Sequence, residues 1–100
     1  MLIWIPVDGT DEKLSKITKL IEVKHWALVE LEGGNVKSTK FFDKREDYGE
    51  WVDFIILENK FEAYIDFMNE GMMVLCIRKE ETIEDIIEAY KFKELDEVGF

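Results

Sequence analysis

The chain of 100 residues is long enough for one domain, and 47% of its residues are apolar, which supports a packed core and excludes a disordered chain. Its 23 Asp and Glu residues against 13 Lys and Arg residues give a formal net charge of −10 at pH 7. A negative field of this size repels nucleic-acid phosphates and anionic lipids, so we expect no nucleic-acid or membrane binding, and instead a cationic, metallic or basic-protein partner.

The first half of the sequence predicts a strand and then a hairpin. Residues 2–7 form a continuous apolar run that ends at Asp8-Gly9-Thr10, as a buried strand does. Residues 11–22 carry apolar side chains at helical spacing and predict a helix, or a loop with a helical turn. Residues 25–32 and 36–42 flank Gly33-Gly34-Asn35 and predict two antiparallel strands. The charged residues 43–50 predict an exposed loop.

The second half predicts a strand–helix–strand–helix unit with parallel strands. Residues 51–57 and 72–77 are the two apolar strands. Asn59 begins the first helix, with Glu62 three residues later, and Thr82 begins the second. The predicted buried faces are Phe61, Tyr64, Ile65 and Met68 in the first helix, and Ile83, Ile86, Ile87 and Tyr90 in the second. The whole chain, residues 1–100, is predicted to form one α/β domain with a mixed sheet.

The single cysteine, Cys76, cannot form a disulfide within the chain. The N-terminus lacks the charged and apolar pattern of a signal peptide, and no apolar run approaches the roughly 20 residues that cross a bilayer. These features predict a cytoplasmic protein.

Several short segments, in this order, resemble the dinitrogenase iron-molybdenum cofactor biosynthesis family. They read Ile-Pro-Val-Asp-Gly at 5–9, Ala-Leu-Val-Glu-Leu-Glu at 27–32, Val-Asp-Phe-Ile-Ile at 52–56, Phe-Glu-Ala at 61–63, Asn-Glu-Gly at 69–71, Thr-Ile-Glu-Asp at 82–85, Glu-Ala-Tyr at 88–90 and Lys-Glu-Leu at 93–95. The resemblance implies a ribonuclease H-like α/β fold, with flanking helices and a five-stranded mixed sheet in the order 3-2-1-4-5. It also implies a non-catalytic protein that binds an iron-molybdenum or iron-sulfur cluster precursor and contacts other cofactor-biosynthesis proteins.

The chain departs from the family at three places. The stretch where the family has His-Phe-Gly, whose His is a candidate cofactor ligand, reads Lys19-Leu20-Ile21 here. The family's Gly-Asn-Ile-Gly-Pro loop is reduced to Glu58-Asn59-Lys60, and the helix that precedes the fourth strand is missing from residues 43–50. The resemblance therefore implies a shortened, divergent member.

In the strand order that the resemblance implies, the first and fourth strands are neighbours whose crossovers leave in opposite directions, so a crevice is expected outside their carboxyl ends. Asp8, Gly9, Glu58 and Asn59 follow these strands and are the candidate cofactor-binding residues. His25, the only imidazole, begins the neighbouring strand and is the candidate metal ligand. The same positions also suit ordinary turn, cap and rim residues.

Three other patterns have competing interpretations. Met72, Met73 and Cys76 could suggest a soft-metal site, but strand alternation places them on two faces, which favours core packing. A metal-dependent nuclease would need converging carboxylates such as Asp8 and Asp53. The aromatic pair at residues 41–42 could support a homodimer at a strand edge, or lie buried under the last helix.

Three functional hypotheses follow. The first is a non-catalytic carrier that holds a metal cluster or its precursor in the crevice, and the second is a scaffold that has lost the cofactor and acts through protein contacts. The third is a nuclease whose cleavage requires a divalent ion and Asp8.

Overall fold

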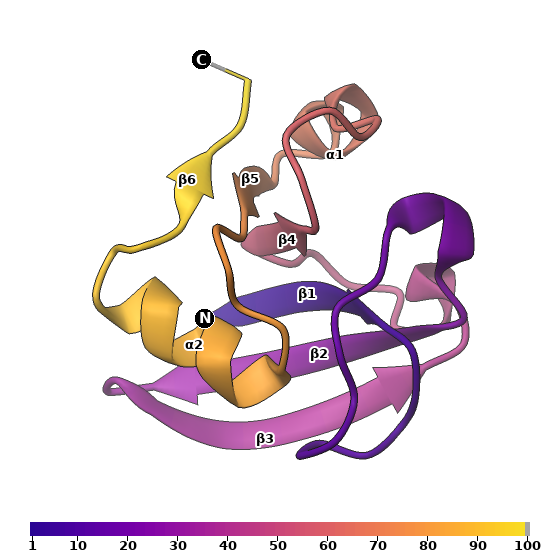
Figure 1. The fold of residues 1–100 in the computed structure, drawn as a ribbon. Helices are drawn as coiled ribbons and strands as arrows, with labels where there is room; N and C mark the ends of the chain where they lie inside the picture. The colour runs from indigo at the N-terminus through magenta and orange to yellow at the C-terminus, as the bar shows by residue number, and fades with distance from the viewer. Residues whose placement is uncertain (100) are drawn as a thin grey trace.

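The structure, a computed structural model, describes residues 1–99 and centres on one mixed six-stranded sheet in the order β3-β2-β1-β4-β5-β6 (Figure 1). The strands are β1 (Leu2–Val7), β2 (His25–Glu32), β3 (Asn35–Phe42), β4 (Phe54–Leu57), β5 (Met73–Cys76) and β6 (Asp96–Glu97). The helices are α1 (Ile65–Asn69) and α2 (Ile83–Lys91), with 3₁₀ turns η1 (Leu20–Glu22) and η2 (Arg45–Asp47). Within residues 1–99, neither helix has the length and apolar character needed to span a membrane.

The strand pairing follows the predicted topology for the first five strands. β4 lies between β1 and β5 and is parallel to both, while β2 pairs antiparallel with β1 and β3. Gly33 and Gly34 have φ angles of 61° and 82°, the left-handed values that the tight β2–β3 turn requires. The predicted strand count of five is wrong, because Asp96 and Glu97 pair antiparallel with β5 as a sixth strand. Two exposed acidic residues have no alternation that could reveal such an edge strand.

The two faces of the sheet are covered in different ways. α2 packs on one face, where Ile83, Ile86 and Ile87 meet β1 and β2. Its predicted cap is confirmed, because the Thr82 hydroxyl accepts a hydrogen bond from the Asp85 N–H at 3.1 Å. The other face is covered by α1 through Phe67 and by the loop at residues 43–53. Figure 1 shows α2 and α1 on opposite sides of the sheet.

Residues 11–22 form a loop that ends in η1, which confirms the second of the two predicted alternatives, and Leu14 and Ile21 are exposed. The strand predicted at residues 51–57 begins only at Phe54, so that Trp51 remains 61% exposed. The apolar side chains of these segments predicted burial, but the segments lie outside the sheet and several of these side chains are exposed.

The helix predicted to begin at Asn59 instead begins at Ile65 and buries the opposite face. Asn59 caps a turn, because its Oδ1 accepts a hydrogen bond from the Phe61 N–H at 2.8 Å. Phe61 is 85% exposed, whereas Phe67, which was not predicted, is buried. Most of the apolar side chains that were predicted to be buried in this helix are therefore exposed.

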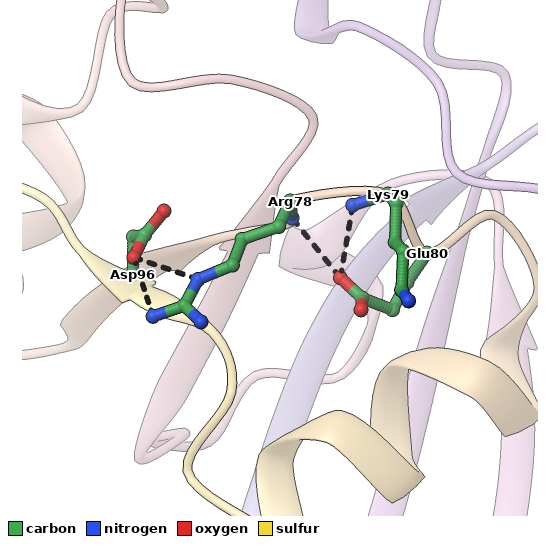
Figure 2. A network of polar contacts seen from close by, with 4 residues as sticks. All are labelled: Arg78, Lys79, Glu80 and Asp96. Carbon is green, nitrogen blue, oxygen red and sulfur yellow. Dashed lines mark hydrogen bonds and ion pairs between the residues drawn. The ribbon is translucent and has the colours of Figure 1, made fainter.

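The loop between β5 and α2 is held by a buried carboxylate (Figure 2). Glu80 is 8% exposed, and its Oε1 accepts hydrogen bonds from the N–H groups of Arg78 and Lys79 at 3.0 and 3.3 Å. The Arg78 side chain extends to Asp96 of β6, with Nε 3.0 Å from Oδ1. Burial alone would raise the pKa of Glu80, but the backbone N–H donors outweigh it and the pKa is lowered from its ordinary value of 4.5.

This lowered pKa predicts a pH dependence of stability. Because the pKa of Glu80 is lower in the folded state than in the unfolded state, its contribution is present above about pH 4.5 and is lost as the pH falls through the folded value. We expect urea unfolding between pH 6 and about pH 3 to show a smaller loss of stability for Glu80→Gln than for the wild type. The exposed control Glu12→Gln should follow the wild type, and parallel profiles for all three proteins would contradict this role.

Candidate functional site

The predicted site residues lie at one end of the sheet. His25 is paired with Val7, the last residue of β1, and Asp8 and Gly9 follow directly. Glu58 and Asn59 follow β4, which runs parallel to β1 as its neighbour. The connectivity therefore brings all five predicted residues to the carboxyl ends of β1 and β4, where the crevice was expected.

The expected crevice is crossed by the segment at residues 16–20. The Thr18 N–H donates to the carbonyl of Pro6 in β1 at 2.9 Å. On the other side, the Ile17 N–H donates to the Glu81 carbonyl at 2.8 Å, in the loop before α2. This segment therefore supplies backbone hydrogen bonds that close the end of the sheet.

Asp8 and Gly9 are used to hold this loop in place. The Asp8 carboxylate accepts a hydrogen bond from the Lys16 N–H at 2.9 Å, and the Asp8 N–H donates to the Lys16 carbonyl at 3.0 Å. A Cβ at Gly9 would lie 3.2 Å from the hydroxyl of Ser15, which is buried and accepts a hydrogen bond from Asp11. These contacts explain why Asp8 and Gly9 occur here as turn residues.

Glu62, which sequence reasoning treated only as a helix-capping residue, joins the two loops at this end. One carboxylate oxygen accepts hydrogen bonds from the N–H groups of Glu58 and Asn59 at 3.1 and 3.4 Å, and the other from the Leu20 N–H at 2.5 Å. The Asn59 amide donates in turn to the Glu58 carboxylate at 3.2 Å. The pattern Asn59-x-x-Glu62 predicted the local contact, but not the contact with Leu20, 42 residues away in the chain.

His25 has one carboxylate neighbour. Its Nδ1 lies 3.2 Å from Oδ1 of Asp43, and the imidazole is partly buried. Cys76 packs in the core on the α1 side of the sheet, and burial is the main cause that raises the pKa of its thiol. His25 instead shares the α2 side with Val7 and Ala27. The imidazole and the thiol are therefore on opposite faces and cannot bind the same ion.

The possible metal-binding side chains of residues 1–99 lie apart from one another. Within residues 1–99, no three His, Cys, Asp or Glu side chains are grouped closely enough to hold a metal ion. Met72 and Cys76 both pack among core residues, as their alternation predicted, whereas Met73 faces the other way and is partly exposed. Asp8 and Asp53 lie at opposite ends of β1, because the Asp53 carboxylate accepts a hydrogen bond from the Leu2 N–H at 2.8 Å. These two carboxylates do not converge as a two-metal nuclease requires.

Arg45 forms a second feature near this end that the sequence did not reveal. Its guanidinium lies over the ring of Trp26 at 5.5 Å and over the ring of Phe67 at 4.7 Å. It also makes two hydrogen bonds of 3.2 Å to the Glu70 carboxylate. Arg45 therefore connects the loop at residues 43–53 and the end of α1 to the sheet.

An exposed apolar surface lies on the outer side of α1 and the turn before it. Ile65 and Met68 are three residues apart on α1, Phe61 lies in the turn before the helix, and all three are exposed, with Phe61 at 85% and Ile65 at 61%. We refer to these three residues as the α1 surface. The aromatic pair at residues 41–42 does not provide a similar surface, because Phe41 packs against the core under α2 and Phe42 against Trp4.

Comparisons with known proteins show what fold this arrangement belongs to. No family model and no curated protein sequence matches the chain. A crystal structure from Methanocaldococcus jannaschii, provisionally named a dinitrogenase, is similar with a TM-score of 0.79 and 21% identity over 99% of this chain and 95% of that one. An NMR structure from Thermotoga, provisionally named a NifB protein, has a TM-score of 0.73 and 19% identity over 99% and 95%. At such low identities, these likenesses show a shared fold.

Proposed function

We propose that this chain is a non-catalytic binding domain related to nitrogenase-associated proteins, and that it acts by contact with a partner protein. The shared fold and the provisional names of the similar structures support the relationship. The same relationship supports assigning the fold to the ribonuclease H-like class. In this proposal the chain has kept the scaffold of a cofactor-biosynthesis protein without a metal site of its own.

The α1 surface is the observation that carries the proposal. Three large apolar side chains are exposed on this short segment, their removal from water by a partner is favourable, and such patches mark interaction sites. Phe67, on the opposite side of the same helix, is buried and fixes the orientation of α1. The surface is thus presented on an element that is already packed against the sheet.

The charge of the chain indicates the chemistry of the partner. With a net charge of −10, two copies of this chain repel each other, whereas a basic protein is attracted over a distance of about 10 Å at moderate salt. α1 itself carries the exposed carboxylate of Asp66 beside the apolar side chains. We therefore propose a partner with an apolar patch surrounded by Lys or Arg, rather than a second copy.

Exchange of one exposed phenylalanine tests the proposal. We expect Phe61→Ser to weaken capture of a basic partner from the native extract by about tenfold or more, because burial of a phenylalanine contributes roughly 1.5–3 kcal/mol. Phe92→Ser is the matched control, because Phe92 is also exposed, at 65%, but follows α2. Capture should be quantified at two salt concentrations and should weaken with salt.

Equal capture by Phe61→Ser and Phe92→Ser would contradict the proposal. Sedimentation analysis of the purified chain gives an independent check. A dimer that Phe61→Ser dissociates would show that the α1 surface binds a second copy, which would overturn the proposed basic partner.

A carrier of a cluster precursor is the second candidate, and the His25–Asp43 pair favours it. Asp43 also borders a hollow of about 370 Å³ on the α1 side of the sheet, between residues 43–46 and α1, which His25 does not line. In this version the cluster is a cargo, His25 supplies one ligand, and the remaining ligands come from the cargo or from a delivering protein. His25→Ala would then abolish metal retention and leave the fold intact.

A further inference from the structure

A large groove lies at the end of the sheet opposite the predicted site, where β1 begins. Its volume is about 760 Å³, within the range of roughly 300–1,000 Å³ that is typical of small-molecule sites. It is bordered by the start of β1, the β2–β3 turn, the end of α2 and β6, which Figure 1 shows gathered on one side of the molecule. Neither the α1 surface nor His25 contributes to it.

The floor of the groove is apolar. Leu31, Phe54, Leu75 and Leu95 come from four separate segments of the chain and line it together. The ring of Phe54 packs edge-on against Tyr90 of α2, with centroids 5.1 Å apart. α2 ends at Lys91 and leaves this part of the sheet face uncovered. Met73, at the start of β5, is 46% exposed and also lines the groove.

The charges that line the groove oppose the charge of the whole chain. Of the described residues that line it, Lys91 and Lys93 are basic and Glu97 is acidic, although the chain carries −10. Lys93 has a φ of 58°, a left-handed conformation that helix ends normally assign to glycine. Its N–H donates to the Tyr90 carbonyl at 3.2 Å, which closes the end of α2. A lysine therefore occupies a position where its backbone is strained, and this residue lines the groove.

Tyr90 offers a hydrogen-bond donor in the same place. Its hydroxyl donates to the sulfur of Met1, which is a weak acceptor. Burial, and then the charge of Asp53, raise the pKa of Tyr90, so the hydroxyl stays protonated at pH 7. A stronger acceptor on a ligand, such as a carboxylate, would be a better partner than the thioether.

We propose that this groove binds an amphipathic carboxylate, with its apolar chain on the floor formed by Leu31, Phe54 and Leu75 and its carboxylate near Lys91 and Lys93. The apolar floor and the volume of the groove fit an apolar chain, and the two lysines favour a negatively charged head group. A cationic amphiphile of the same length meets two like charges there and binds less tightly. This site is separate from the α1 surface, so it goes beyond the proposed function and can fail without it.

Titration with dodecanoate, below its micelle concentration, tests the proposal on the whole chain. We expect calorimetric binding, and amide chemical-shift changes at Leu31, Leu75 and Leu95. Lys93→Glu should weaken binding by about tenfold or more, because a charge-assisted contact becomes a repulsion. Lys24→Glu makes the same charge change on an exposed lysine that does not line the groove, and it should leave the affinity within about twofold.

Two further comparisons make the result decisive. Met73→Glu places a carboxylate at an exposed groove residue and should also weaken binding, while the thermal midpoint of each variant verifies folding. Dodecyltrimethylammonium should bind more weakly than dodecanoate to the wild type. The proposal is overturned if dodecanoate does not bind, if its shifts map to other residues, if Lys93→Glu and Lys24→Glu bind equally, or if the cationic amphiphile binds as tightly.

Discussion

Trp4→Ala should lower the free energy of unfolding by about 3–5 kcal/mol, the largest effect that we expect from a single substitution. Trp4 is 2% exposed and packs edge-on against Trp26, Phe42 and Tyr48, with ring centroids 6.1, 5.7 and 5.9 Å away. Removing the indole leaves a cavity and removes three aromatic contacts at once.

Chemical denaturation measures this effect, and the chain provides a matched control. Trp51→Ala removes the same side chain from a position that is 61% exposed, and it should change stability by about 0.5 kcal/mol or less. If both tryptophan variants lost the same stability, the aromatic packing under the loop at residues 43–53 would not be a main source of stability.

Glu62→Ala should destabilise the fold by about 2–3 kcal/mol, the second-largest expected effect. The substitution removes the acceptor of three backbone N–H groups, and one of these, from Leu20, connects the segment at residues 16–20 to the loop after β4. Glu62→Gln keeps acceptor oxygen but not the charge, and should cost less. Glu12→Ala, at an exposed position, is the control.

Amide hydrogen exchange shows which part of the fold is destabilised by Glu62→Ala. The amides of Leu20, Glu58 and Asn59 should exchange faster in Glu62→Ala, while the amides of α2 keep their protection. Unchanged exchange at Leu20 would show that the carboxylate does not hold the two loops together.

The elements that were predicted correctly are specified by residues close together in the sequence. Thr82 caps α2, and Ile83, Ile86 and Ile87 repeat with the period of a helix, so that both the start and the buried face of α2 were predictable. The hairpin turn was predictable because Gly33 and Gly34 tolerate positive φ. The placement of Asp8, His25 and Asn59 at one end of the sheet was predictable from the strand order that the family resemblance implies.

The elements that were missed depend on contacts between distant segments. Phe61 was expected to be buried, but the hydrogen bond between Glu62 and Leu20 holds its turn away from the core. Arg45 looked like one charge in a polar loop, and only the fold places it between two aromatic rings and Glu70. The groove was unpredictable for the same reason, since its floor combines four separate segments.

Anaerobic metal analysis tests the central claim most directly, namely that the chain is a binding domain without a metal cluster held by its own side chains. The wild type and His25→Ala should be purified and incubated with iron, sulfide and molybdate, and the retained metal measured after desalting. The account predicts less than one metal per chain, with equal amounts in both proteins, because no group of three donor side chains exists within residues 1–99. Stoichiometric metal in the wild type that is lost in His25→Ala would contradict it and establish the carrier instead.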